Sequence, residues 1–153
     1  MSDFSPYRTD RTNLRSLPTA GHSASHASRD IIMDISQTIA ELKKRPGFKD
    51  NVGMILIHNG VVRNWSRKDR TAVAALEVTP DFARIEKLRQ EYLAREGIFE
   101  IIIEARAGRF TPGDDLLFII VAGDIRENIK PVLAELLDRV KSEAIGKKEI
   151  AVC

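Results

Sequence analysis

The sequence predicts an α+β domain with a mixed or antiparallel sheet. Segments whose apolar residues recur at helical spacing alternate with pairs of short apolar strands, in the order helix, two strands, helix, two strands, helix. The chain has 153 residues, a length that fits one globular domain, and no internal repeat is evident.

The first 28 residues differ from the rest of the chain. They are rich in Ser, Thr, Arg and Pro, and their scattered apolar residues show no period. We therefore predict a flexible N-terminal tail over residues 1–28 and one folded domain over residues 29–153.

The folded part is expected to open with a helix and two strands. From Asp30 apolar residues recur at helical spacing until Pro46-Gly47 stops the run. Residues 52–62 then read as a strand that is apolar on both faces. After a polar loop, residues 71–78 form a second strand.

A second helix is predicted between Thr79 and Gly97. Thr79 is a good N-cap, Pro80 fits the first helical position, and Gly97 marks the end. The predicted apolar stripe consists of Phe82, Ile85, Leu88 and Tyr92.

Two more strands are predicted over residues 99–105 and 116–121. The first is rich in isoleucine, and the second is a continuous apolar run of the kind that fills a buried strand. Between them, Pro112-Gly113 suits a type II turn.

A last helix follows, and its start depends on Pro131. Because proline is comfortable only in a first turn, this helix begins near Asn128, or near Asp124 with a disturbed first turn. Gly146 would end the helix, and residues 147–152 could form a short terminal strand.

Composition excludes several classes of protein. The formal net charge is only +2, which is too small an excess for a dedicated nucleic-acid binder. The single cysteine, Cys153, excludes an internal disulfide framework and a cysteine-rich zinc site, and it favours the cytoplasm. No apolar run is long enough to span a bilayer, so we expect no membrane partner.

The residue inventory also limits the chemistry. Two of the three histidines, His22 and His26, lie in the predicted tail, so a histidine triad or a multi-histidine metal site is not expected. His58 is interpreted as a strand histidine with a satisfied hydrogen bond. No phosphate-binding loop, dinucleotide motif or zinc-protease motif occurs, and we expect no cofactor.

Acidic and basic residues near the ends of elements have two interpretations. Asp114, Asp115 and Asp124 are interpreted as structural, because aspartate caps and bends the chain beside turns. Lysine near a helix C-terminus often only complements the helix dipole. The functional alternative is a pocket in which several cations converge, where arginine grips phosphate and a crowded lysine loses its proton more easily. The candidates for that pocket are Arg63, Arg126, Lys141 and the adjacent pair Lys147-Lys148.

Four segments resemble the large, catalytic subunit of molybdopterin synthase. GMILIHNGVVRN resembles that family's first core strand, which ends in Gly-x-Val-Arg-Asn, and ALEV resembles the next strand. FTPGDDLLFIIVAGDIR resembles its Pro-Gly-Asp turn, buried strand and arginine-bearing helix start. VKSEAIGKKE resembles its two-lysine segment, in which the lysines are seven positions apart. The order and spacing of these segments cover roughly residues 50 to 149.

The resemblance implies a hammerhead-type fold and a sulfur-transfer reaction. In that family a small subunit inserts its C-terminal Gly-Gly thiocarboxylate into the large subunit, and sulfur passes to cyclic pyranopterin monophosphate. The resemblance assigns catalytic roles to Lys141 and Lys148 and substrate binding to Arg63 and Arg126. It also implies a homodimer of large subunits within a heterotetramer, with pocket residues that can be shared across the dimer.

The alternative is a non-catalytic paralogue that keeps the fold and binds a ubiquitin-like small subunit or another partner. Ile125 stands where the family usually has histidine, and the chain stops at Cys153 where the family continues. Residues 145–147 also replace the proline and aromatic residues that usually precede the second lysine. These departures favour the paralogue, whereas the lysine pair favours the enzyme.

Overall fold

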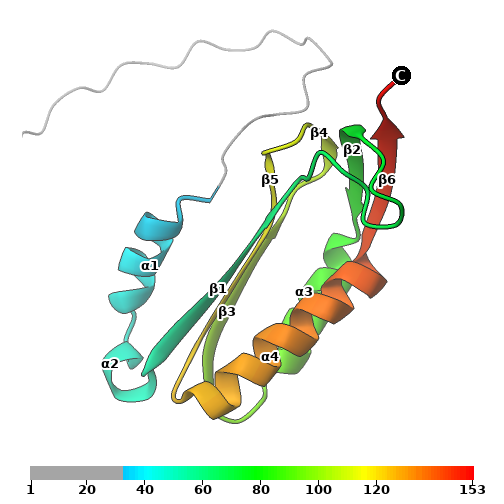
Figure 1. Cartoon of the computed structure of the whole chain (residues 1–153). Coiled ribbons are helices and arrows are strands. Elements are labelled where there is room, and N and C mark those ends of the chain that lie inside the picture. The colour runs from blue at the N-terminus through cyan, green and yellow to red at the C-terminus, as the bar shows by residue number, and fades with distance from the viewer. Residues whose placement is uncertain (1–32) are drawn as a thin grey trace, which may run out of the picture.

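The computed structural model describes residues 33–153, so the predicted tail over residues 1–28 lies outside the described part. Figure 1 shows the arrangement of the elements along the chain. The helices are α1 (Ile35–Lys43), α2 (Phe48–Asn51), α3 (Phe82–Leu93) and α4 (Arg126–Arg139), and α4 continues into a π-helical turn, η1 (Val140–Ala144). The strands are β1 (Met54–Val61), β2 (Val73–Pro80), β3 (Ile98–Ala105), β4 (Gly108–Phe110), β5 (Asp115–Gly123) and β6 (Ile145–Ala151).

Two three-stranded sheets form the frame of the domain. One has the order β1-β5-β3 and the other the order β4-β2-β6, and every pairing is antiparallel. The predicted α+β class is therefore confirmed, with an antiparallel rather than a mixed sheet. The central strand β5 is buried from Leu116 to Gly123, which explains its continuous apolar sequence.

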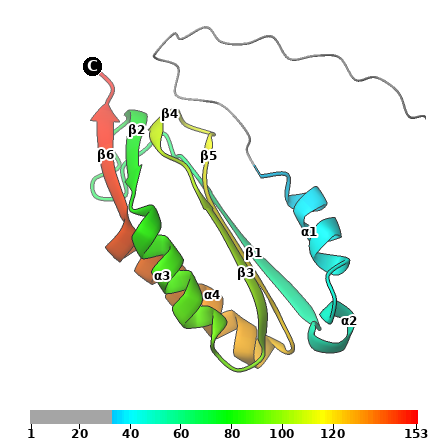
Figure 2. The ribbon, with the colours of Figure 1, turned by 180° about the vertical axis from the view of Figure 1, so that it is seen from behind.

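The β1-β5-β3 sheet separates two apolar clusters. Helices α3 and α4 pack on one face, where residues such as Ile119, Val121 and Leu136 are completely buried. Helices α1 and α2 pack on the other face, against Ile120 and Ala122. Figure 2 shows the same two layers of helices from behind.

The start of the second helix differs from the prediction. Thr79 and Pro80 belong to the end of β2, where they pair with Gly146 and Ile145 of β6. The N-cap is Asp81, whose side chain accepts a hydrogen bond from the Arg84 backbone N–H. The predicted stripe is correct except for Phe82, which is 58% exposed at the first position of the helix.

The last helix begins at Arg126, midway between its two predicted starts at Asp124 and Asn128. Ile125 is its N-cap, and Pro131 lies inside the helix, beyond the first turn. The prediction that Gly146 ends the helix was wrong, because helical structure ends at Ala144 and Gly146 lies in β6. The predicted terminal strand is present and starts at Ile145. Within residues 33–153, no helix is long and apolar enough to cross a membrane.

Gly97 lies in the α3–β3 connection and contacts the β5–α4 connection, at the end of the sheet where α4 starts. Its φ is +77°, and its carbonyl accepts a hydrogen bond from the Asp124 N–H. A Cβ at Gly97 would collide with the Asp124 carboxylate and the Asn128 amide. That carboxylate accepts hydrogen bonds from the Ile125 N–H and from Asn128 at the start of α4.

We predict that Gly97→Ala destabilises the fold more than Gly113→Ala does. Both glycines have positive φ, so alanine at either position costs about 1–2 kcal/mol of backbone strain. Only Gly97→Ala also displaces the Asp124 carboxylate, which adds about 0.5–1.5 kcal/mol for each hydrogen bond lost. A Cβ at Gly113 meets no atom within 4 Å. Urea unfolding of the two variants measures the difference, and equal losses would contradict this role of Gly97.

Candidate active site

A cavity of about 710 Å³ opens where the two sheets meet. Its walls come from the C-terminal half of β1, the loop after it, β2, β5, η1 and β6. The polar side chains that line it are His58, Asn59, Arg63, Trp65, Arg67, Lys141, Lys147 and Glu149.

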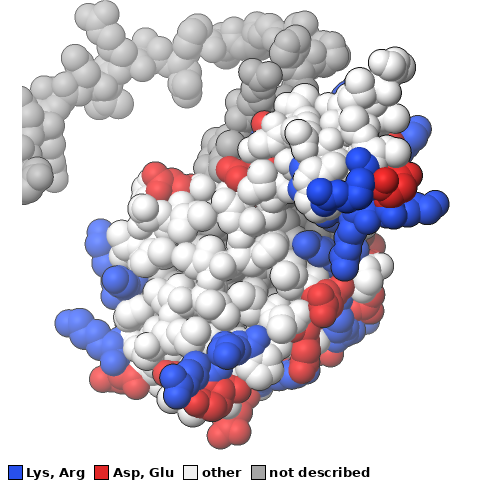
Figure 3. Space-filling model, in the orientation of Figure 1, with Lys and Arg blue, Asp and Glu red and all other residues white. Residues whose placement is uncertain are grey.

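The cavity is strongly cationic. Arg63, Arg67, Lys141 and Lys147 line it, and Glu149 is the one carboxylate that the described residues contribute to its wall. None of these four cations forms an ion pair within residues 33–153. Figure 3 shows lysine and arginine side chains gathered over the β1–β2 loop and β6. Such a site favours an anionic ligand, since unpaired positive charges in a concave wall attract and hold negative groups.

The end of β1 places Arg63 at this cavity. The Val62 N–H donates to the Asp114 carbonyl, and the Gly113 N–H donates to the Val62 carbonyl, each at 2.9 Å. These bonds hold the strand end beside the turn predicted at Pro112-Gly113. Arg63 was predicted as one of the cations of a shared pocket, and it lies in the cavity wall.

Lys141 reaches the cavity from η1, the turn that connects α4 to β6. Val140 and Ala144 in this turn are buried, whereas Lys141 is exposed and lines the cavity. The Ala144 carbonyl accepts a hydrogen bond of 2.7 Å from the Asp81 N–H, which fixes the turn against the start of α3. A π-helical turn inserts one residue per turn, and such turns occur often at functional sites.

Lys147, and not Lys148, shares the cavity with Lys141. Along β6 the residues Ile145, Lys147 and Glu149 line the cavity, and Lys148 does not. The reason is strand geometry, because successive side chains of a β-strand point to opposite faces. Arg67 and Trp65 were not predicted as site residues, and from the pair Lys147-Lys148 the prediction chose Lys148. The alternation of residues 145–149 was the signal that could have identified Lys147.

The environment of Lys147 favours loss of its proton. Partial burial and the neighbouring charges of Lys141 and Arg63 lower the pKa of the Lys147 ammonium, and Glu149 acts in the opposite direction. A lysine of lowered pKa can act as a proton carrier or a nucleophile near neutral pH.

His58 lies on the floor of the same cavity. Its Nε2 atom is buried and has no hydrogen-bond partner within the described residues. The prediction of a satisfied strand histidine is therefore wrong for this atom. Burial, together with the charges of Lys141 and Lys147, lowers the pKa of the His58 imidazole below its ordinary value of 6.5.

Arg126 lies at the opposite end of α4 from Lys141. The helix has 14 residues, so its two ends are about 20 Å apart. The Arg126 side chain is 76% exposed and pairs with Glu127 at 3.0 Å. It lines a second, shallower cavity with Gly53, Met54 and Ile125. One copy of the chain therefore does not bring all four predicted site residues together.

The fold and the cavity together define a class: an α+β domain of the hammerhead type with a cationic pocket at the junction of its sheets. A family model described as "MoaE protein" matches residues 29–143. The chain belongs to this MoaE family.

Individual relatives agree with the family. A Haloferax volcanii protein named "Probable molybdopterin synthase" is 29% identical over 119 residues, which are 74% of this chain. The match spans 45% of that relative, so this chain corresponds to less than half of its length.

Within residues 33–153, no group of histidine, cysteine and carboxylate side chains is arranged to hold a metal ion.

Solved structures share the fold at low identity. Molybdopterin synthase from Staphylococcus aureus superposes with a TM-score of 0.64 at 19% identity, covering 80% of this chain and 88% of that one. Protein E of molybdopterin cofactor biosynthesis from Burkholderia multivorans gives 0.62 at 24% identity, covering 87% and 92%. A Helicobacter pylori complex of subunits 1 and 2 of molybdopterin-converting factor gives 0.56 at 16% identity, covering 76% and 79%.

Proposed function

We propose that this chain is the catalytic subunit of a molybdopterin synthase, acting in the cytoplasm. It would transfer sulfur from the thiocarboxylated C-terminus of a small carrier subunit to cyclic pyranopterin monophosphate. The observation that carries the proposal is the convergence of Arg63, Lys141 and Lys147 on one cavity in a chain of the MoaE family. The subunit complex from Helicobacter pylori supports a small-subunit partner.

The cavity offers the groups that this reaction needs. Both reactants are anionic, one through a phosphate and the other through a thiocarboxylate, and Arg63 and Arg67 supply guanidinium donors for such groups. In each sulfur transfer the thiocarboxylate sulfur replaces an oxygen substituent on a pterin carbon, so a carbon–sulfur bond forms as a carbon–oxygen bond breaks. Water then cleaves the acyl–sulfur bond, which leaves the sulfur on the pterin and a carboxylate on the small subunit. Each step moves a proton, which Lys147 with its lowered pKa is suited to carry, while Lys141 stabilises negative charge.

We assign to Lys147 the catalytic role that the family resemblance implied for Lys148. Lys148 follows on the opposite face of β6 and pairs in register with Glu77 of β2. It therefore serves as a matched control, because it is an exposed lysine of the same strand that lies outside the cavity wall.

Arg126 enters the proposal through a second copy of the chain. Strand β1 is an edge strand whose eight residues, MILIHNGV, include no charge and no proline, the usual protections of a free edge. The Arg63 cavity lies at the C-terminal end of β1, and Met54 at its other end lies beside Arg126. Antiparallel pairing of two β1 edges would bring Arg126 of one copy towards the Arg63 cavity of the other.

A non-catalytic paralogue is the second candidate function. Ile125 is 53% exposed directly before Arg126, so this surface offers an apolar side chain where the family usually has histidine. Such a protein would bind the small subunit at the same cavity without turnover.

We predict that lysine-to-arginine variants separate these functions. The purified chain is mixed with thiocarboxylated small subunit and cyclic pyranopterin monophosphate, and molybdopterin is measured. Lys141→Arg and Lys147→Arg should each lose about tenfold or more in rate, because arginine keeps the charge but does not release a proton. Lys148→Arg should stay near the unsubstituted rate. If Lys148→Arg is the more damaged variant, the assignment of Lys147 is wrong, and a stable complex without any product selects the paralogue.

We further predict that two inactive variants complement each other if the site is shared. The Lys147→Ala and Arg126→Ala proteins are denatured, mixed and refolded together. The mixture is then tested in the same sulfur-transfer assay. Random pairing makes half of the dimers mixed, and each of these has one intact site, so about a quarter of the activity should return. No recovery, with mixed dimers detected by mass spectrometry, would show that Arg126 does not complete the site of a second copy.

A further inference from the structure

The loop between β1 and β2 carries an arginine pair on one aromatic ring. The guanidinium carbons of Arg63 and Arg70 each lie 4.2 Å from the centroid of the Trp65 ring. Trp65 and Arg63 line the cavity, and Arg70 comes from the far arm of the loop. Neither arginine has a carboxylate partner within the described residues.

Backbone hydrogen bonds fix the shape of this loop. Trp65 forms a β-bridge with Ala72, and the Ser66 N–H donates to the Thr71 carbonyl at 2.8 Å. The Arg70 N–H donates to the Ser66 carbonyl at 2.9 Å, and Ser66 is buried. The position of Arg70 on the ring is thus set by an ordered loop.

Arg70 holds this position with an unfavourable backbone. Its φ is +63°, and within residues 33–153 it is the one residue other than glycine with a positive φ. A left-handed conformation is strained for a residue with a Cβ, and such strain is typically retained at functional sites. Glycine would adopt this backbone conformation with less strain, so the presence of arginine here requires a reason in its side chain.

Stacking on an indole leaves an arginine free to bind a ligand. A carboxylate partner would neutralise the guanidinium and occupy its N–H groups, whereas a ring face attracts the charge and leaves the N–H edge open. Both guanidinium carbons lie 4.2 Å from a single centroid, so they are separated by at most twice that distance, and their N–H groups can meet at the edge of the ring. One phosphate group held by both arginines at once fits this span.

We propose that Arg63, Trp65 and Arg70 form a phosphate clamp at the mouth of the cavity. Trp65 is its positioning residue, and Arg70 is a binding residue that lies outside the cavity wall. The clamp takes a phosphate ester, and the adjoining cavity takes the group that the phosphate carries. That this group is a pyranopterin rests on the proposed function, whereas the binding of phosphate does not.

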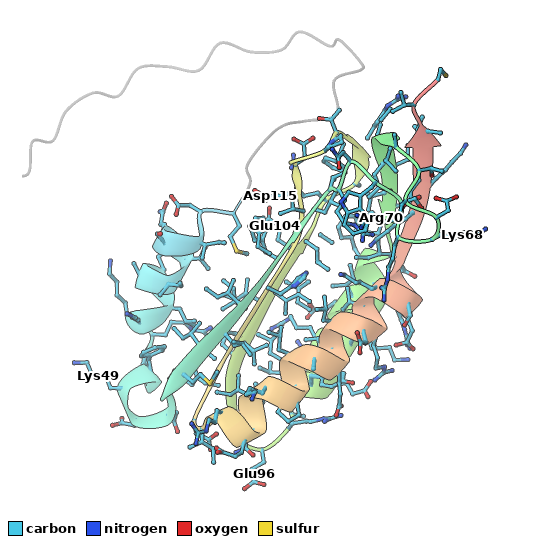
Figure 4. All side chains as sticks on the ribbon, in the orientation of Figure 1. Lys49, Lys68, Arg70, Glu96, Glu104 and Asp115 are labelled. Carbon is cyan, nitrogen blue, oxygen red and sulfur yellow. The ribbon has the colours of Figure 1, made fainter. Side chains whose placement is uncertain are left out.

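The chain provides its own probe and a matched control. Trp65 is the only tryptophan in the sequence, so its fluorescence reports directly on the clamp. Lys68 lies in the same loop and points away from the molecule (Figure 4), whereas Arg70 lies on the Trp65 ring. Lys68→Gly removes the same charge as Arg70→Gly and leaves the arginine pair intact.

In the test, the full chain is titrated with inorganic phosphate, and binding is measured by tryptophan fluorescence and by calorimetry. We expect Arg70→Gly to weaken phosphate binding about tenfold while its melting temperature stays equal or rises, because glycine relieves the strained φ. Lys68→Gly should bind nearly as the unsubstituted chain does. By calorimetry, Trp65→Leu should lose binding, and Trp65→Phe should recover part of it, because phenylalanine keeps a ring face for the arginines.

Several outcomes would overturn the clamp. These are absence of phosphate binding in the unsubstituted chain, equal binding by Arg70→Gly and the unsubstituted chain, and equal losses in the Arg70 and Lys68 variants. In the sulfur-transfer assay, Arg70→Gly should raise KM for the pterin substrate with little change in kcat. If the chain has no sulfur-transfer activity, the phosphate titration still decides, so the clamp and the proposed function fail separately.

Discussion

The antiparallel pairing of β6 with β2 determines which cations share the cavity. Residues of β6 alternate between two faces, and the register that sets Lys148 opposite Glu77 directs Lys147 and Glu149 into the cavity. The turn η1 determines where this alternation begins, because it ends α4 and is followed directly by β6. It also places Lys141 at the cavity. A shift of β6 by one residue would exchange Lys147 for Lys148 and change the chemistry of the site.

The arginines that lie on aromatic rings elsewhere in the described residues also have hydrogen-bond partners. Arg45, Arg95 and Arg139 pair with carboxylates, and Arg106 donates to the Asp115 carbonyl. On the outer surface of α3, α4 and η1, Arg84 pairs with Glu143 at 2.6 Å, and Arg139 pairs with Glu91 and Glu143 at 2.7 Å. Such exposed pairs contribute little to stability, but they satisfy the guanidinium groups. Around the cavity, Arg63 and Arg70 instead rest on Trp65, and their N–H groups stay open. This contrast supports a binding role for the second set.

Much of the fold could be predicted from the sequence because its elements have strong local patterns. The buried strand β5 and the apolar stripe of α3 follow from continuous and periodic apolar residues, and Arg63 could be placed at a strand end. The short elements α2 and β4 were missed because four and three residues carry no period. Thr79 and Pro80 have the local signals of a helix start, but pairing with β6 keeps them in a strand.

The site was predicted only in part because Lys148 was chosen by resemblance to the family's two-lysine segment, and a seven-residue spacing does not show which face of a strand carries the second lysine. Lysines seven residues apart share a helix face, yet the chain changes from helical to strand geometry at Ile145, and the period changes with it. Lys141 was found from the sequence, but the second cavity lysine is Lys147. The distance of Arg126 from the cavity depends on the length and direction of α4, which no local pattern contains.

The pKa of His58, followed by NMR of its imidazole, tests most directly whether Lys141 and Lys147 share this cavity. In the unsubstituted chain the value should lie below 6.5, because burial and the two lysines disfavour the charged ring. The contribution of His58 to the free energy of unfolding is then fully present above pH 6.5. It falls as the pH drops below that value, since the unfolded chain takes up the proton first. Lys147→Met should raise the pKa, and Lys148→Met should leave it nearly unchanged. An ordinary His58 pKa, or a larger response to Lys148→Met than to Lys147→Met, would contradict the account.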